Sequence, residues 1–350
     1  MLLAAPQVTA AAAPAVWERF DPPHDTTSNL TVQQLVAFGR NDAVLHGVTR
    51  APWCDDCVNR HLWRFDGQRW NTLALPGALL GGTLTGTAPD DYWLFGTDAQ
   101  VRFHGYHWDG RAWTDLSPSP TLFQPGNAHA FTRDDVWAVG DDRTGGGFRA
   151  AIAHYDGTSW STVLAPDAST SAVTLTTVRA FAANDVWVGG YVGALTGTPQ
   201  PYLAHWNGTG WSRVAAPTFT PGALVTSLAS HGGVVWAAGS TRGSAKQSFA
   251  LRRSGTGWTT TTLPGPASES PSLAVVDGEL WAGMRPTTPP PAATGCDTCL
   301  ARWTGTAWES MAQPLAGTTS ARVFSIPGGG AWVAGGIRNW ADYTTYLVRQ

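Results

Sequence analysis

Charged residues are scarce in this sequence, and lysine is almost absent. Only 13% of the 350 residues are Asp, Glu, Lys or Arg, and Lys246 is the single lysine. The formal net charge is −3. Proteins that bind nucleic acids concentrate positive charge on one face or along one stripe. No such basic patch is visible here, so the sequence argues against a nucleic-acid partner.

Long apolar runs, helical periods and familiar catalytic motifs are also missing. No stretch of 18 or more apolar residues occurs, so no membrane span is expected. No segment sustains a 3.6-residue apolar period, which predicts little helix. The G-x-S-x-G elbow, the P-loop, H-E-x-x-H and a dinucleotide fingerprint are absent. The sequence therefore predicts no cofactor and favours a protein without catalytic activity.

Residues 1–15 are uncharged and rich in alanine. Their small residues suit a signal-peptidase site, whereas the basic n-region is missing and the apolar run is short. We expect residues 1–15 to be a signal-like or flexible leader, and residues 16–350 to form a secreted domain.

Tryptophan is abundant, with 19 residues, and most of it is periodic. Two columns recur every 43 to 51 residues. The first follows a short apolar stretch and precedes a glycine: Trp93, Trp137, Trp187, Trp236, Trp281 and Trp332, with Val44 in the same place one unit earlier. The second follows an aromatic–Asp/Asn–Gly pattern in most units: Trp70, Trp113, Trp160, Trp211, Trp258 and Trp308. This period predicts a repeat architecture.

Each unit contains four short runs rich in Val, Trp, Tyr and Thr, separated by turn residues. Such runs predict β-strands. The steps Asp66-Gly67 and Asp156-Gly157 predict tight hairpins with type I′ turns. Four antiparallel strands in each of seven units describe an all-β, seven-bladed β-propeller.

The seventh unit reaches only its third strand at Gln350. Residues 16–20, which include Trp17, match the fourth-strand pattern of the other units. We therefore expect the N-terminal strand to complete the last blade and close the ring, which removes an open sheet edge. Residues 16–350 are then a single propeller domain.

A third column supports this register. Three residues before the hairpin glycine, every unit has His or Arg, as in Arg64, His107 and His154. Four units also have Asp two residues before the second-strand position, as in Asp91 and Asp135. We interpret the Asp as a turn cap that accepts a hydrogen bond from the His or Arg across the blade.

The pattern DVWAVG…H(W/Y)(D/N)GTxW, best seen from residue 135 to residue 160, resembles that of secreted bacterial β-propellers common in actinobacteria, which are loosely kelch-like. The resemblance covers nearly the whole chain. It implies the fold and says little about activity, because one fold hosts many functions.

The units differ most between their second and third strands, at residues 48–60 of blade 1, 284–298 of blade 6 and 336–343 of blade 7. These blades are consecutive in a closed ring, so their loops should share one sector of one face. All four cysteines lie there, as Cys54–Cys57 and Cys296–Cys299. Three interpretations stay open: a disulfide within each pair, a cross-link over blade 7, or a zinc site with four thiolates.

Two loop tryptophans, Trp53 and Trp340, lie outside both columns. An exposed Trp stacks on sugar rings or anchors a protein partner, although both residues could instead pack on the loop bases. Further polar candidates for ligand binding lie in the same loops: Asp55, Asp56, Asp297 and Arg338.

The innermost strands provide a second candidate place. His129 and Arg179 lie eight residues before their second-strand Trp, in blades 3 and 4. They could hold a small anion or a metal at the central channel, or simply be solvated lining residues.

Together these features favour an extracellular binding module that recognises a carbohydrate, as a lectin does, or a protein. Two alternatives stay open. One is a secreted polysaccharide hydrolase or lyase that uses acids of the variable loops. The other is a scaffold subunit of a secreted assembly. The protein would be a monomer or part of a larger assembly.

Overall fold

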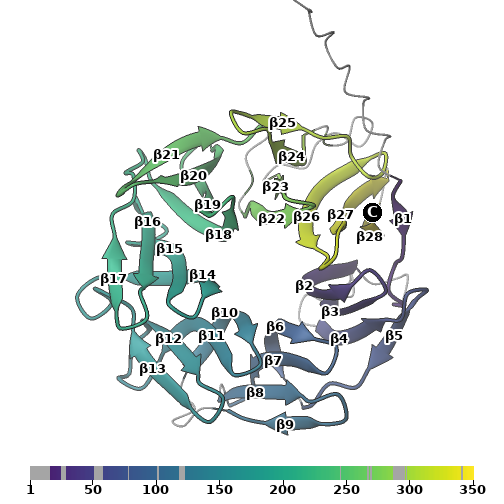
Figure 1. Ribbon diagram of the computed structural model, residues 1–350, viewed down its shortest axis with the longest axis horizontal. Helices are drawn as coiled ribbons and strands as arrows, with labels where there is room; N and C mark the ends of the chain where they lie inside the picture. Colours follow the sequence, from purple (N-terminus) through teal and green to yellow (C-terminus); the bar gives the residue numbers. More distant parts are fainter. Residues whose placement is uncertain are drawn as a thin grey trace, which may run out of the picture.

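The computed structural model forms a ring of seven sheets (Figure 1). It describes residues 16–24, 29–50, 58–77, 79–100, 102–117, 123–244, 246–265, 268, 270–286, 296, 298–339 and 342–350. None of these residues is helical. Within the described ranges, accordingly, no helix is long and apolar enough to cross a membrane.

Every sheet has four antiparallel strands. Their order follows the chain from the centre of the ring outward in blades 1 to 6, and in blade 7 the outermost strand is the N-terminal β1. The first three blades are β2 (Asn29–Gly39), β3 (Asp42–Arg50), β4 (Val58–Phe65) and β5 (Trp70–Leu73); β6 (Leu80–Ala88), β7 (Asp91–Thr97), β8 (Phe103–Trp108) and β9 (Trp113–Asp115); and β10 (Phe123–Thr132), β11 (Asp135–Asp142), β12 (Arg149–Tyr155) and β13 (Trp160–Leu164). Blades 4 and 5 are β14 (Val173–Ala182), β15 (Asp185–Val192), β16 (Gln200–Trp206) and β17 (Trp211–Val214), then β18 (Ala223–His231), β19 (Val234–Thr241), β20 (Ser248–Ser254) and β21 (Gly257–Thr262). Blade 6 is β22 (Ser272–Val276), β23 (Glu279–Gly283), β24 (Leu300–Trp303) and β25 (Trp308–Ser310), and blade 7 is β26 (Thr318–Ser325), β27 (Ala331–Asn339), β28 (Asp342–Arg349) and β1 (Glu18–Arg19).

The N-terminal strand closes the ring, as the sequence predicts. Strand β1 pairs with β28, with Glu18 opposite Arg349. The Arg349 guanidinium also donates a hydrogen bond of 2.8 Å to the Glu18 carboxylate. Phe20 then reaches blade 1, where its ring lies 4.9 Å from that of Phe65. The strand is shorter than the predicted 16–20, but it supplies the missing fourth strand of blade 7.

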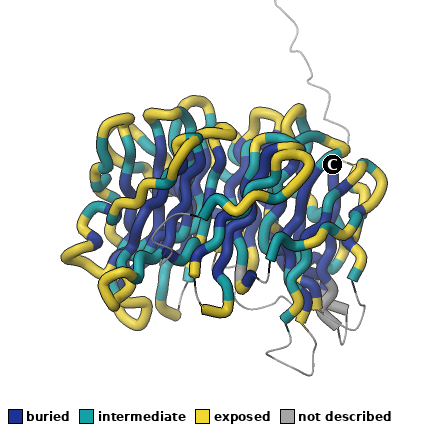
Figure 2. The backbone as a smooth tube through the Cα atoms, turned by 90° about the horizontal axis from the view of Figure 1, so that it is seen from below, coloured by how far each residue is buried: buried dark blue, intermediate teal, exposed yellow. Residues whose placement is uncertain are grey.

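The tryptophan columns lie at the contacts between blades. All six second-strand tryptophans are buried. A fourth-strand Trp of the next blade packs on most of them: Trp160 on Trp93 at 5.8 Å, Trp211 on Trp137 at 5.6 Å, Trp258 on Trp187 at 5.8 Å, Trp308 on Trp236 at 6.0 Å and Trp70 on Trp332 at 5.4 Å. Buried residues fill the middle of the strands and exposed residues lie at the two faces (Figure 2).

The predicted pairs between Asp and His or Arg are present. The carboxylates of Asp42, Asp91, Asp135 and Asp185 accept hydrogen bonds of 2.8 to 2.9 Å from Arg64, His107, His154 and His205. The cation or imidazole also covers the blade Trp, since the His154 ring is stacked 3.8 Å from Trp137. This column is therefore part of the frame of the blades.

The turn prediction was wrong in detail. Gly67 has a positive φ of 95°, but Asp66 does not, so the turn is not type I′. The hairpin instead closes at the pair Phe65–Trp70 around a four-residue loop. The Asp66 carboxylate accepts the N–H groups of Gln68 and Arg69, each at 2.9 Å. The Asp66 side chain thus accepts hydrogen bonds from the turn that a backbone carbonyl would accept in a two-residue turn.

Deleting residues 16–20 should destabilise the whole ring. The deletion exposes the edge of β28 and removes the Phe20 contacts with blade 1. We expect a lower unfolding temperature and faster amide exchange in blade 4 as well as in blade 7. A loss of protection confined to blade 7 would show that the blades unfold independently.

Acid should weaken the hairpins. Hydrogen bonds from Thr158 and Ser159 lower the pKa of Asp156 to about 2, and those from Arg69 and Gln68 lower the pKa of Asp66 to about 2. A carboxyl group whose folded-state pKa lies below its ordinary value of 3.8 stabilises the fold above about pH 4 and loses that effect as the pH falls toward 2. Denaturation midpoints measured from pH 5 to pH 2 should therefore fall less steeply for Asp156→Asn than for the wild type. Blade 4 already has Asn207 at this position, making the same backbone contacts, so the variant should fold. If the midpoints of Asp156→Asn and of the wild type fell equally steeply with pH, the stabilising role of the Asp156 carboxylate would be contradicted.

Candidate functional site

The three variable loops leave one sector of one face. They join β3 to β4 in blade 1, β23 to β24 in blade 6 and β27 to β28 in blade 7. Strands β22, β26 and β2 are neighbours along the inner wall, so these blades are consecutive (Figure 1). The loops emerge from equivalent ends of the sheets, as the sequence predicts.

Most of the predicted loop residues lie outside the described residues: Trp53, Cys54, Asp55, Asp56, Cys57, Asp297 and Trp340. Arg338 lies on β27, where its backbone pairs with Tyr343 of β28. The structure therefore places the bases of the three loops side by side, and contact between the candidate side chains stays a prediction.

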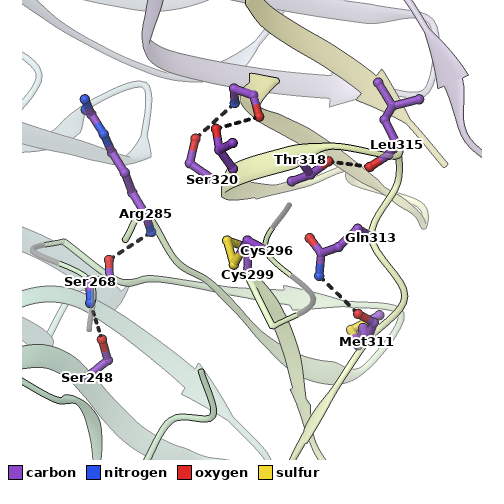
Figure 3. The surroundings of a disulfide bond; sticks show 12 residues. Ser248, Ser268, Arg285, Cys296, Cys299, Met311, Gln313, Leu315, Thr318 and Ser320 are labelled. Atoms are coloured by element: carbon purple, nitrogen blue, oxygen red, sulfur yellow. Dashed lines mark hydrogen bonds between the residues drawn. A yellow bond between two sulfur atoms is a disulfide. The ribbon is translucent and has the colours of Figure 1, made fainter. Parts of the chain in front are cut away.

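A disulfide anchors the loop of blade 6. Cys296 and Cys299 are joined with an S–S distance of 2.08 Å, and both are buried (Figure 3). The backbone N–H of Cys296 donates to the carbonyl of Thr318 at the start of β26, at 2.6 Å. The bridge packs in the apolar cluster that contains Ile337 and Tyr346. It thereby ties the loop of blade 6 to blade 7.

This pairing decides between the interpretations of the second cysteine pair. A bridge between Cys296 and Cys299 excludes a cross-link of either residue to Cys54 or Cys57 over blade 7. It also leaves neither sulfur as a thiolate for zinc. Among the described residues, no group of three or more His, Cys, Asp or Glu side chains could hold a metal ion. Cys54 and Cys57 lie outside the described residues.

The Cys296–Cys299 bridge should be detectable by thiol chemistry. Under denaturing, non-reducing conditions, an alkylating reagent should modify neither residue, and reduction should make both reactive in peptide mass mapping. Replacing both by serine should lower the free energy of unfolding by about 2 kcal/mol, the entropy of closing so short a loop. Alkylation of Cys299 before reduction would contradict the bridge.

Two histidines beneath the loop of blade 1 escaped the sequence analysis. His46 on β3 is buried, and burial lowers its pKa to about 4, so it is neutral at pH 7. His61 on β4 is stacked on Trp63 at 4.9 Å and shares a hydrogen bond of 2.8 Å with Thr49. The missed signal was a His on each of two paired strands. The hydrogen bond of His61 joins β4 to β3 near the strand ends from which the loop departs.

His129, a predicted channel residue, joins two blades. It lies on β10, and its Nδ1 accepts the backbone N–H of Ala180 on β14, at 3.1 Å. Burial and the charge of Arg179 hold its pKa well below the ordinary value. His129 is therefore neutral, and its Nδ1 is already used in holding blade 3 to blade 4.

Arg179, the other predicted channel residue, lies on β14 in the register equivalent to His129. Each is opposite its second-strand Trp, Trp187 and Trp137. Among the described residues no carboxylate pairs with Arg179, and burial lowers the pKa of its guanidinium. The structure therefore brings both predicted residues to the inner wall on neighbouring blades.

An exposed aromatic residue lies on the same face in another sector. Phe148, before β12 of blade 3, is 69% exposed, and the guanidinium carbon of Arg143 lies 4.5 Å from its ring centre. Leu195, in the equivalent loop of blade 4, is 46% exposed. The sequence analysis did not select these loops because they contain neither Trp nor Cys.

A depression of about 590 Å³ lies at the opposite face. Arg40, Asp277, Gly328–Gly330 and Gln350 line it, where the turns between first and second strands meet the chain end. Asp277 already accepts the N–H of Gly330, and Arg40 donates to the carbonyl of Gln350. No predicted site residue contributes to it.

No family model matches this sequence, and the search of curated proteins finds no match either. Solved structures show the fold. YCF48 bound to D1 peptide is 14% identical, with 97% of this chain and 98% of that chain covered and a TM-score of 0.59. The β-propeller domain of the Trilobed protease from Pyrococcus furiosus is 7% identical, with 94% and 95% covered and a TM-score of 0.60.

An oligogalacturonate lyase in complex with manganese is also similar, with 12% identity, 96% and 98% covered and a TM-score of 0.53. A peptide-binding protein, a protease domain and a lyase thus share this architecture. Identities this low show a seven-bladed β-propeller and do not select among the activities.

Proposed function

We propose that the protein is a secreted, non-catalytic binding module that recognises carbohydrate with the loops of blades 6, 7 and 1. The observation that carries this proposal is that the bases of the three variable loops lie side by side in one sector of one face. Loops on a fixed scaffold are the usual place for ligand recognition. The Cys296–Cys299 bridge, which holds one of these loops against blade 7, supports it.

The chemistry of the loops favours a sugar ligand. Trp53 and Trp340 belong to adjacent blades and have no place in the repeat. A Trp presents a flat apolar face to the C–H groups of a sugar ring, and nearby Asp55, Asp56, Asp297 and Arg338 can bond its hydroxyl groups. The same residues could anchor a protein, so a protein ligand is an outcome that the test must separate.

A disulfide in the loop supports an extracellular location. Disulfides persist in oxidising compartments and are rare in reducing ones. The absence of a specific catalytic motif from the sequence supports a binding function over hydrolysis or eliminative cleavage of a polysaccharide. Turnover of a polysaccharide would instead favour the enzyme, with acids from the same loops.

The test is a glycan array with the wild-type protein and single alanine variants. Trp53→Ala and Trp340→Ala should each weaken binding to the selected glycan by about 30-fold, which corresponds to loss of an interface anchor worth about 2 kcal/mol. Phe148→Ala is the matched control, because it removes an exposed aromatic from another sector of the same face. The carbohydrate proposal would be overturned if the wild-type protein bound no glycan on the array, or if neither Trp substitution weakened binding.

A further inference from the structure

The wall of the central channel contains positive charge and no negative charge. The first strands of the seven blades, β2, β6, β10, β14, β18, β22 and β26, surround the centre of the ring (Figure 1). These strands contain no Asp or Glu, and their only arginines are Arg179 and Arg322. The chain as a whole has more acidic than basic residues, 25 against 22. The wall therefore has a charge opposite in sign to that of the protein.

Most other polar side chains of this wall already have partners in the next blade. Thr85 accepts the N–H of Ala130 at 2.8 Å, and Asn127 accepts that of Val178 at 3.1 Å. Ser227 accepts the N–H of Leu273 at 3.0 Å. Each bond links one inner strand to its neighbour, in the same way as that of His129. These residues link neighbouring blades by hydrogen bonds to the backbone. The surroundings of the two arginines are different.

Arg179 and Arg322 lie on opposite sides of the channel. Strand β14 belongs to blade 4 and β26 to blade 7, which face each other across the ring (Figure 1). Arg179 is opposite Trp187, and Arg322 is one inward-facing position before Phe324, which is opposite Trp332. One such step is about 7 Å along a strand, which is within the reach of an arginine side chain.

The two guanidinium groups lack acidic partners. Arg322 donates to the backbone carbonyl of Gln33 at 2.5 Å and lies 5.5 Å from the ring centre of Phe324. The side chain keeps accessible surface while its strand neighbours Ala321 and Val323 are buried, so this surface faces the channel. Burial and the charges of Arg179 and Arg285 lower the pKa of Arg322.

Arg285 contributes a third positive charge. It follows β23, and its backbone N–H is held by Ser268 Oγ at 2.9 Å, while its side chain extends away from that contact (Figure 3). Its charge contributes to lowering the pKa of Arg322. Like charges that line one channel repel one another and attract an anion.

We propose that the channel binds a small oxyanion, a carboxylate or a phosphate group, between the guanidinium groups of Arg179 and Arg322. Arg is suited to this role because its planar N–H groups match the oxygens of both groups bidentately. Since His129 Nδ1 accepts from Ala180, its proton lies on Nε2, which supplies a neutral donor beside Arg179. A metal cation is disfavoured there, because the wall has no carboxylate and its charges repel it.

Two variants and a control test the site without touching the loops. Inorganic phosphate and malonate are titrated into the full chain at constant ionic strength set with chloride, and binding is followed by calorimetry and by the unfolding temperature. The wild type should bind at least one of the two probes and unfold at a higher temperature in its presence. In Arg179→Gln and Arg322→Gln the affinity should fall at least tenfold. Arg111→Gln, which changes an exposed arginine of the β8–β9 turn, should bind as the wild type does.

The double variant Arg179→Gln/Arg322→Gln provides a second measurement. Removal of unpaired like charges should raise its unfolding temperature in chloride alone, and the probes should add nothing further. If the glutamine variants fail to fold, Arg179→Lys and Arg322→Lys keep the charge and lose the fork, so the affinity should still fall. Binding of phosphate alone identifies a phosphate site, and binding of malonate alone identifies a carboxylate site. No binding of either probe, or equal binding by the double variant, would overturn the proposal and leave the glycan test unaffected.

Discussion

The ring depends on one repeated contact, the packing of a fourth-strand tryptophan on the second-strand tryptophan of the preceding blade. Trp211 on Trp137 and Trp258 on Trp187 are examples, with ring centres 5.6 and 5.8 Å apart. Edge-to-face pairs of this kind contribute about 0.5–1.5 kcal/mol beyond the burial of their area. At the closure of the ring, Trp70 of blade 1 packs on Trp332 of blade 7, with the ring planes tilted by 53°. The ring then has no terminal blade with an unpartnered face.

This frame absorbs the periodic polar residues as well. In blade 3, Asp135 orients His154, and His154 lies flat on Trp137, so three columns of the sequence meet in one contact. A residue that recurs in most blades is therefore explained by the blade itself. The proposed recognition therefore rests on residues that break the repeat, which the sequence places in the loops of blades 6, 7 and 1 and on the inner strands.

The fold was predictable from the sequence because its determinants are local and repeated. The spacing of Trp137 and Trp187 counts blades without any knowledge of long-range contacts, and Trp17 identifies the closing strand. Geometry within a single turn was not predictable in this way, since Gly67 alone adopts the positive φ and the Asp66 side chain replaces part of the turn. The pairing of the cysteines was not predictable either, because their spacing in the sequence does not show which sulfur atoms lie close together in the fold. Arg322 was missed because the count of eight residues before the second-strand Trp leads to Phe324 in blade 7, and Arg322 lies two residues earlier on the same strand.

A closed ring imposes one further constraint that bears on function. It forces seven inner strands together, so their inward side chains share one narrow space whatever their chemistry. Small or hydrogen-bonded residues such as Thr85 and Ser227 fit this space and stabilise the ring, because they bond to the next blade. Arg179 and Arg322 destabilise the packing of the inner strands, because each adds a charge that no described carboxylate neutralises. Residues that weaken a local arrangement without a compensating partner in the protein are typical of functional positions. The stability supplied by the tryptophan contacts is what allows such a pair to persist, and a bound anion would be the missing partner.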